Sequence, residues 1–171
     1  ELWSQVLVSF NNSKLYLRYH NEYRNKKIKN KIYKIFEKRN IKKERIVFID
    51  GDEKKTYLEY YNKIDVGLDT FPYSGATTTF AALCMGVPVL TLTGKNYISR
   101  QSASILSVVG LQNWIVREEN QYIKKLKKLI NLKNIYRIRL NLRKQITESP
   151  LCDGKDFTKN FENSMKNLLN E

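Results

Sequence analysis

The stretch that decides the fold is residues 65–92, DVGLDTFPYSGATTTFAALCMGVPVLTL. Its pattern predicts a strand over 64–69, a loop of turn residues over 70–76, a helix over 77–85 closed by a glycine, and a strand over 87–92. The second strand is almost continuously apolar, which is typical of a strand covered on both faces of a sheet. A strand, a helix and a buried strand in succession indicate a parallel sheet.

The same alternation continues on both sides of this stretch. Further strands are expected over 14–19, 45–49 and 114–116, and further helices over 1–9, 22–39, 53–63, 97–108, 118–131, 134–146 and 156–169. Strands that alternate with helices predict an α/β fold with a doubly wound parallel sheet (Rossmann-like), followed by C-terminal helices. A chain of 171 residues suits one domain, and we expect residues 1–171 to form a single domain.

The chain is strongly basic, with 31 Lys and Arg against 17 Asp and Glu and a formal net charge of +14. Such a balance can neutralise the phosphates of a nucleic acid. The lysines, however, are scattered in pairs such as 26–27, 42–43 and 124–125, mostly on expected helices, where a solvated face is the ordinary arrangement. We therefore expect no nucleic-acid partner. Hydrophobic residues make up 42% of the chain, which is enough for a buried core.

Several classes of protein and of site are disfavoured by the composition. No window approaches roughly 18 uncharged apolar residues, so we expect no membrane-spanning helix. The lack of a secretory leader and the two distant cysteines, Cys84 and Cys152, predict a cytoplasmic location rather than a disulfide framework. With one histidine, His20, and no cluster of metal ligands, we expect no metal and no cofactor. The first residue is Glu1 rather than Met, so we expect a fragment of a longer chain.

The chemically informative segment is the loop and helix start at 74–79. Backbone N–H groups in the first turn of a helix carry a partial positive charge, three threonines at 77–79 add hydroxyl donors, and Gly75 allows close backbone approach. Together these features suit a phosphate site at the carboxyl end of a strand. A second interpretation is equally open, in which Thr77 is simply the N-cap of the helix. The absence of a G-x-G-x-x-G motif disfavours a nicotinamide or flavin enzyme.

The whole run 65–92 resembles the C-terminal catalytic half of the O-linked N-acetylglucosamine transferase family, most closely the bacterial members that follow a tetratricopeptide-repeat array. Similar features continue at 45–48, 99–100, 103–104, 110–111 and 149–151. The resemblance implies a GT-B glycosyltransferase of two Rossmann-like domains, of which this chain is the C-terminal, nucleotide-binding one. The N-terminal catalytic half and the tetratricopeptide repeats would then lie outside the given sequence.

Carried over position by position, the resemblance implies a diphosphate site at the start of the helix. Thr77 and Thr78 would bind the diphosphate of a nucleotide sugar, and Gly75 and Ala76 would shape the loop before them. Asp69, at the end of the preceding strand, has two open roles: it acts near the sugar, or it caps the loop that follows.

The nucleobase site that the resemblance implies lies on a separate segment. Asp52 would contact uracil through its backbone, Lys54 would lie beside the base, and the Tyr57 ring would stack on it where the family often has a histidine. Alternatively, Tyr57 simply packs against its own helix. Ala81 stands where the family usually has an acidic residue that hydrogen-bonds the ribose, so we expect weaker nucleotide affinity or a contact from another residue.

The function that the resemblance implies is transfer of a sugar from a UDP-sugar, with UDP-N-acetylglucosamine favoured, to Ser or Thr hydroxyls of an acceptor protein. The general base is expected on the N-terminal half, so the chain alone should bind UDP weakly and turn over nothing. Two alternatives stay open. One is a Spindly-type enzyme that uses GDP-fucose, and the other is a degenerate, non-catalytic basic binding module, which Ala81 favours.

Overall fold

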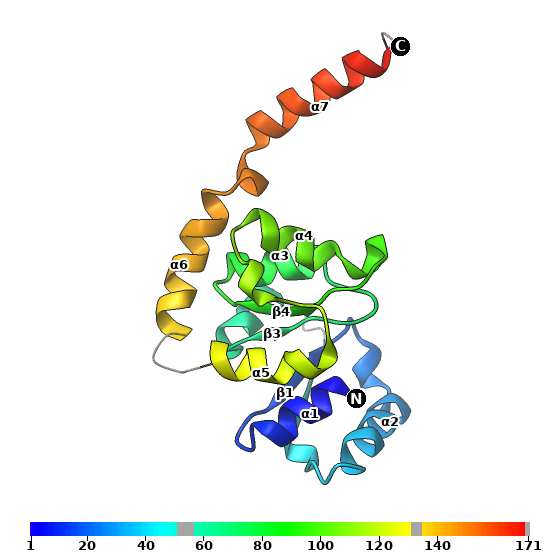
Figure 1. The fold of residues 1–171 in the computed structure, drawn as a ribbon. Helices are drawn as coiled ribbons and strands as arrows, with labels where there is room; N and C mark the ends of the chain where they lie inside the picture. The colour runs from blue at the N-terminus through cyan, green and yellow to red at the C-terminus, as the bar shows by residue number, and fades with distance from the viewer. Residues whose placement is uncertain (51–56, 131–134, 170–171) are drawn as a thin grey trace.

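The computed structural model describes residues 1–50, 57–130 and 135–169 and has an α/β architecture (Figure 1). The strands are β1 (Leu15–Arg18), β2 (Ile46–Ile49), β3 (Gly67–Leu68), β4 (Val89–Leu92) and β5 (Ile115–Val116). The α-helices are α1 (Leu2–Ser9), α2 (Lys26–Glu37), α3 (Thr77–Cys84), α4 (Gln101–Val108), α5 (Glu119–Leu129), α6 (Ile135–Thr147) and α7 (Gly154–Leu169). Short 3₁₀ helices, among them η3 (Tyr57–Lys63), connect these elements.

The strand pairs of the described residues are all parallel, which confirms the predicted fold class. They form two sheets, however: β1 pairs with β2, and the second sheet has the order β3–β4–β5. Strand β3 is only two residues long. The N–H groups of Gly67, its first residue, and of Asp69, directly after it, donate to the carbonyls of Pro88 and Leu90. The side chain of Leu68 packs against the cores of both sheets and joins them.

The larger core surrounds β4, whose four residues are all buried, as its apolar sequence predicted. Helices α3 and α4 cover one face of this sheet and α5 covers the other (Figure 1), which is the doubly wound arrangement. Both α3 and α4 end at a glycine in the left-handed region, Gly86 at φ +71° and Gly110 at φ +74°. This termination is the one that favours glycine over other residues. The second, smaller core packs α1 and α2 against β1 and β2.

Tyr122 links α5 to the central strand and makes stability sensitive to alkaline pH. The side chain is fully buried, and its hydroxyl donates to the Leu90 carbonyl at 3.1 Å. Burial, with a smaller contribution from the Asp69 carboxylate, raises the pKa of Tyr122 above its ordinary value. The folded state therefore keeps the phenol neutral while the unfolded chain ionises it. As a result, the contribution of Tyr122 to the free energy of unfolding is fully present below about pH 10. It decreases as the pH rises further, by up to ~1.4 kcal/mol per pH unit.

Replacing Tyr122 with phenylalanine is expected to lower the free energy of unfolding at pH 7 by about 1 kcal/mol, because one buried hydrogen bond is lost. Above about pH 10 the variant should lose stability less steeply than the wild type, by the equivalent of about one proton. Urea unfolding between pH 7 and 11 measures both effects. Tyr136→Phe is the control, because the Tyr136 side chain is exposed. Equal slopes in the wild type and Tyr122→Phe would contradict the assignment.

Two of the expected helices are interrupted. The helix expected over 22–39 begins as a 3₁₀ turn at Glu22–Arg24, and α2 starts only after Asn25, whose side chain accepts a hydrogen bond from the Lys27 N–H at 2.9 Å. Asparagine is among the preferred N-caps, so it sets the start of α2 against the continuing pattern. The helix expected over 97–108 likewise begins as a 3₁₀ turn, before α4. In the segment expected as a helix over 53–63, the described part is the 3₁₀ helix η3.

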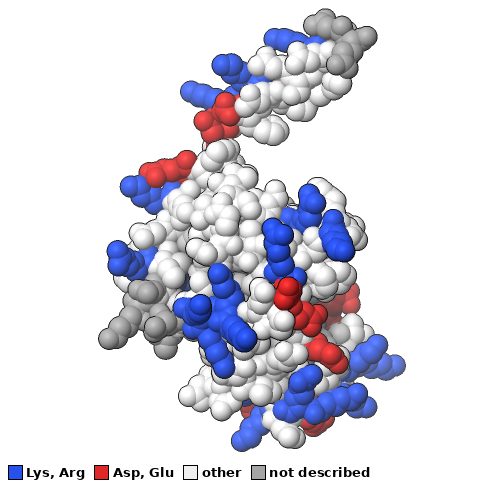
Figure 2. All heavy atoms as spheres, in the orientation of Figure 1, with Lys and Arg blue, Asp and Glu red and all other residues white. Residues whose placement is uncertain are grey.

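Helix α7 extends away from the rest of the molecule (Figure 1) and contains no buried residue. Its apolar side chains lie along one side and include a stacked pair, Phe157 and Phe161, whose ring centroids are 6.2 Å apart. No helix of the described residues is long and apolar enough to span a lipid bilayer. Figure 2 shows that Lys and Arg side chains are spread over the visible face in several groups, with acidic residues between some of them.

Candidate functional site

The carboxylate of Asp69 holds the loop between β3 and α3 through hydrogen bonds. One carboxylate oxygen accepts from the Gly75 N–H at 2.8 Å, and the other accepts from the hydroxyl of the fully buried Thr91 at 2.6 Å. Asp69 therefore caps the loop, which confirms one of its two possible roles. Because its two oxygens bond the loop and β4 respectively, the carboxylate ties the loop to β4.

A second set of contacts fixes the loop to α4 and its leading turn. The buried Ser74 hydroxyl donates to the Ile98 carbonyl at 2.7 Å, and the Ser102 hydroxyl donates to the Gly75 carbonyl at 2.8 Å. Ser102 also shares a hydrogen bond with the Thr79 hydroxyl at 2.8 Å. Neither serine stands out in the sequence, because each acts through a residue more than twenty positions away. Together these contacts make the start of α3 a rigid, preformed edge.

The three consecutive threonines have different environments. Thr77 and Thr78 are exposed in the first turn of α3, whereas Thr79 is buried and bonded to Ser102. The expectation that all three supply hydroxyl donors is therefore wrong for Thr79. The alternative that Thr77 is the N-cap is also wrong, because the N-cap is Ala76 and Thr77 is the first helical residue. Alanine has no side-chain acceptor for the first N–H groups of the helix.

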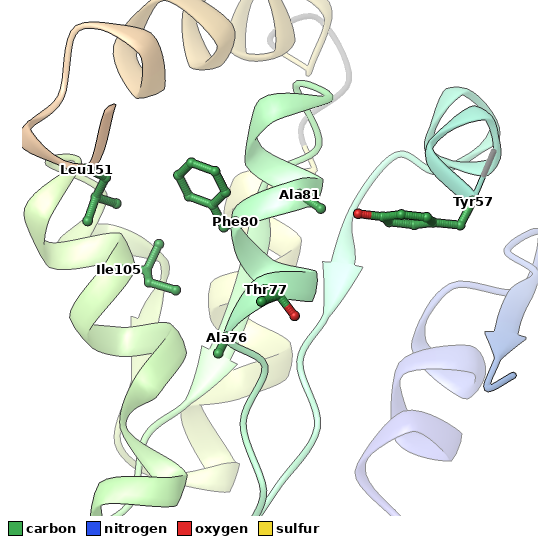
Figure 3. A pocket seen from close by; sticks show the side chains of 7 residues that line it. All are labelled: Tyr57, Ala76, Thr77, Phe80, Ala81, Ile105 and Leu151. Carbon is green, nitrogen blue, oxygen red and sulfur yellow. The ribbon is translucent and has the colours of Figure 1, made fainter. Parts of the chain in front are cut away.

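A cavity of about 420 Å³ opens at this edge (Figure 3). It is lined by Tyr57, Ala76, Thr77, Phe80, Ala81, Ile105 and Leu151. Three of the site residues expected from the sequence, Tyr57, Ala76 and Thr77, thus line one cavity although they come from separate segments. Gly75 directly precedes Ala76 in the loop. Thr78 lines a second cavity, of about 640 Å³, which Tyr57 also lines. Asp52 and Lys54 lie outside the described residues and stay predictions from the sequence.

The Tyr57 ring reaches across from η3 toward α3, with its hydroxyl pointing toward Ala81 (Figure 3). Its side chain is 46% exposed, so the ring presents a free surface to the cavity rather than only packing against its own helix. Ala81 is buried at the cavity wall, where its methyl group offers no hydrogen bond. The Ala81 side chain therefore supplies no polar contact to a ligand in this cavity.

Two contacts fix η3, the element that carries Tyr57. The Tyr61 hydroxyl donates to the Thr78 carbonyl at 3.2 Å, so η3 is joined directly to the first turn of α3. Burial raises the pKa of Tyr61 above its ordinary value, and this phenol stays a neutral donor. Toward the C-terminal end of η3, the Arg139 guanidinium of α6 donates to the Tyr61 carbonyl at 3.2 Å and to the carbonyl of Ile64, directly after η3. Cations at the carbonyl end of a helix are stabilising.

Metal ligands are not gathered in the described part of the chain. There, no three or more His, Cys, Asp or Glu side chains lie close enough to hold a metal ion. The described chemistry of the site consists of backbone N–H groups, two hydroxyls, an aromatic ring and an apolar wall.

Comparison with known proteins identifies the family of this chain. The model of glycosyl transferase family 41 matches residues 1–161. The chain belongs to glycosyl transferase family 41. This membership confirms the resemblance that the stretch 65–92 predicted.

The family 41 chain is similar to plant proteins named "Probable UDP-N-acetylglucosamine--peptide N-acetylglucosaminyltransferase SPINDLY". It is 37% identical to the one from Solanum lycopersicum over 113 residues, which are 66% of this chain and 12% of that protein. It is 28% identical to the one from Petunia hybrida over 174 aligned positions, which cover 98% of this chain and 18% of that protein. The chain therefore spans less than a fifth of the length of these curated relatives.

A solved structure agrees with the family 41 fold. The chain superposes on a mutant O-GlcNAc transferase of Thermobaculum terrenum with a TM-score of 0.89 and 32% sequence identity. The match covers 97% of this chain and 32% of that one. The parallel α/β fold predicted from the sequence, which is that of a GT-B catalytic domain, is thereby confirmed.

Proposed function

We propose that this chain binds the nucleotide part of a UDP-sugar and contributes to transfer of the sugar to Ser or Thr hydroxyls of a protein. The observation that carries the proposal is the cavity at the start of α3, where Tyr57, Ala76 and Thr77 converge in a chain of family 41. UDP-N-acetylglucosamine is the favoured donor, because the plant relatives are named for it and for a peptide acceptor.

The diphosphate binds at the first turn of α3. Backbone N–H groups at a helix N-terminus point toward an anion, and the helix dipole favours negative charge there. The exposed hydroxyls of Thr77 and Thr78 donate to phosphate oxygens from the same turn. The Asp69 carboxylate faces the underside of the loop, where it is occupied by Gly75 and Thr91, and so does not compete for these donors.

The uracil base stacks on the exposed face of Tyr57. Stacking of a base on an aromatic side chain contributes about 1–3 kcal/mol by analogy with single-stranded nucleic acids. The apolar wall formed by Phe80, Ile105 and Leu151 closes the opposite side of the cavity. With Ala81 unable to bind the ribose, most of the affinity comes from the two ends of the nucleotide, the base and the diphosphate.

The chemical role of this chain is stabilisation of the UDP leaving group. Negative charge builds on the diphosphate as the bond to the sugar breaks, and preorganised donors aimed at that charge lower the barrier. Rigid attachment of the loop to β4 and α4 keeps the donors in position without reorganisation. We propose that deprotonation of the acceptor hydroxyl is carried out by another part of the protein, so this chain alone binds UDP without turning over a donor.

Amide-resolved NMR titration of the chain with UDP tests the proposal. UDP is expected to shift the amides of Gly75–Thr79 and Tyr57, whereas GDP and NAD at equal concentration should shift them much less. Thr77→Val, which replaces a hydroxyl by a methyl group of similar size, is expected to weaken UDP binding about tenfold through loss of one hydrogen bond to a charged group. Thr158→Val on α7 is the control and should leave the affinity unchanged, because Thr158 is exposed and lines neither cavity.

Each other outcome points to a defined alternative. Stronger shifts with GDP than with UDP would indicate that the donor is a guanosine diphosphate sugar such as GDP-fucose. Absence of any nucleotide-induced shift at millimolar concentration, together with salt-sensitive binding to RNA or DNA, would support a non-catalytic basic module instead.

A further inference from the structure

Arg18 brings a positive charge to the site from a part of the chain that sequence reasoning did not connect with it. It is the last residue of β1 and is exposed at the carboxyl end of that strand, the end at which ligands bind in doubly wound sheets. Its guanidinium carbon lies 5.5 Å from the centroid of the Tyr57 ring. A guanidinium at this distance over an aromatic face is attracted by the ring quadrupole.

The Tyr57 ring lines two cavities, and Arg18 lines only one of them, the one that Thr77 does not line. Tyr57 lines the cavity of about 420 Å³ together with Ala76 and Thr77, and it also lines the cavity of about 640 Å³ together with Arg18 and Thr78. The ring thus borders the cavity at the start of α3, and the cation that contacts the ring borders the second cavity. A tyrosine that is 46% exposed otherwise has little to hold it in one rotamer.

Arg18 forms no ion pair with a carboxylate of the described residues. The ion pairs of that part of the chain are Lys29–Asp50, Lys43–Glu37 and Lys144–Glu148. What faces Arg18 there is aromatic: the Tyr57 ring, and Tyr61, whose pKa the Arg18 charge lowers against the larger effect of burial. Tyr61 in turn donates to the Thr78 carbonyl, so the Arg18 surroundings connect to the first turn of α3.

We propose that Arg18 is a positioning residue that holds the Tyr57 ring in place as a platform for the nucleobase of the donor. This inference rests on the proposed function. Arg18 acts through the ring and not on the diphosphate, so its loss should affect every ligand that carries the base, with or without phosphates. The conservative change to lysine keeps a cation over the ring and should retain most of the effect.

The test compares uridine and UDP as ligands for the full chain by NMR titration. Arg18→Met is expected to weaken both ligands by the same factor, about two- to fivefold. Tyr57→Leu should weaken both more strongly, and adding Arg18→Met to Tyr57→Leu should cause no further loss, because the ring through which Arg18 acts is gone. Arg18→Lys should recover most of the affinity. Arg117→Met is the matched control, an exposed arginine directly after β5.

A ligand-free measurement examines the contact itself. Arg18→Met is expected to change the ring-carbon chemical shifts of Tyr57 and to broaden them, because the ring regains rotamer freedom, whereas Arg117→Met should not. Unchanged Tyr57 ring signals in Arg18→Met would overturn the inference whatever the ligands do.

The binding outcomes separate this inference from the proposed function. A loss for UDP but not for uridine would mean that Arg18 contacts the diphosphate, and additive losses in the double variant would mean that it acts independently of Tyr57. Either result would overturn the proposed role of Arg18 in holding the Tyr57 ring and would leave the proposed function intact. A wild-type chain that binds neither uridine nor UDP would overturn both.

Discussion

Replacing Asp69 with alanine is expected to lower the free energy of unfolding by about 2–3 kcal/mol and to abolish measurable UDP binding. The carboxylate accepts from the Gly75 N–H and from the buried Thr91 hydroxyl. Alanine leaves both donors without their acceptor, and an unsatisfied buried donor costs about 1–3 kcal/mol. Binding is affected because the loop before α3 loses its attachment to β4, so the diphosphate donors are no longer held in position.

Urea unfolding and UDP titration measure the two effects of the Asp69 replacement. Asp65→Ala is the matched control, since Asp65 is exposed two residues before the same short strand. Asp69→Asn should be milder than Asp69→Ala, because the amide keeps one oxygen for the Gly75 N–H. A loss of less than about 0.5 kcal/mol in Asp69→Ala would show that the carboxylate does not hold the loop.

The second large effect is expected from Gly75→Ala. An added Cβ at this position would lie 2.6 Å from the Thr79 hydroxyl oxygen and 2.7 Å from that of Thr78. The Thr79 hydroxyl cannot rotate away cheaply, because it is bonded to Ser102 in the core. We expect a loss of about 1–3 kcal/mol in unfolding free energy, as for other overpacked sites. UDP affinity should fall at least tenfold, since Thr78 is pushed out of its place in the first turn.

Gly154→Ala provides the comparison for this glycine. Nothing lies within 4 Å of a Cβ added at Gly154, the first residue of α7. Its replacement should leave UDP binding unchanged and leave stability equal or slightly higher. If Gly75→Ala behaves like Gly154→Ala in both assays, the loop is not the close-packed edge described above.

The part of the fold that the sequence predicts best is the stretch from β3 to β4. Its apolar strand, its helix and its closing glycine are all local signals, and the positive φ of Gly86 confirms the last of them. The break before α2 differs from the helix that the sequence predicts over 22–39, although its signal is also local. Asn25 is an ordinary cap, but it stands in a continuing amphipathic pattern, and the expected helix ran through it.

The candidate site was predictable only where the family motif carries it. Thr77, Ala76 and Tyr57 were expected, and they line one cavity. The roles of Thr79, Ser102 and Arg18 were not predictable, because each depends on a contact between segments more than twenty residues apart. Three threonines in a row look alike in a sequence, and only the packing of α4 against α3 separates the buried one from the exposed two.

Helix α7 has a consequence for how the chain moves in solution. Its 16 residues form an arm about 24 Å long that lies outside the rest of the molecule. A compact chain of this length has a radius of gyration of only about 16 Å, so the arm makes the particle markedly elongated. Rotational diffusion is then anisotropic. The N–H bonds of α7, which run along the arm, should relax differently from those of the sheets, and scattering should reveal a long tail in the pair-distance distribution.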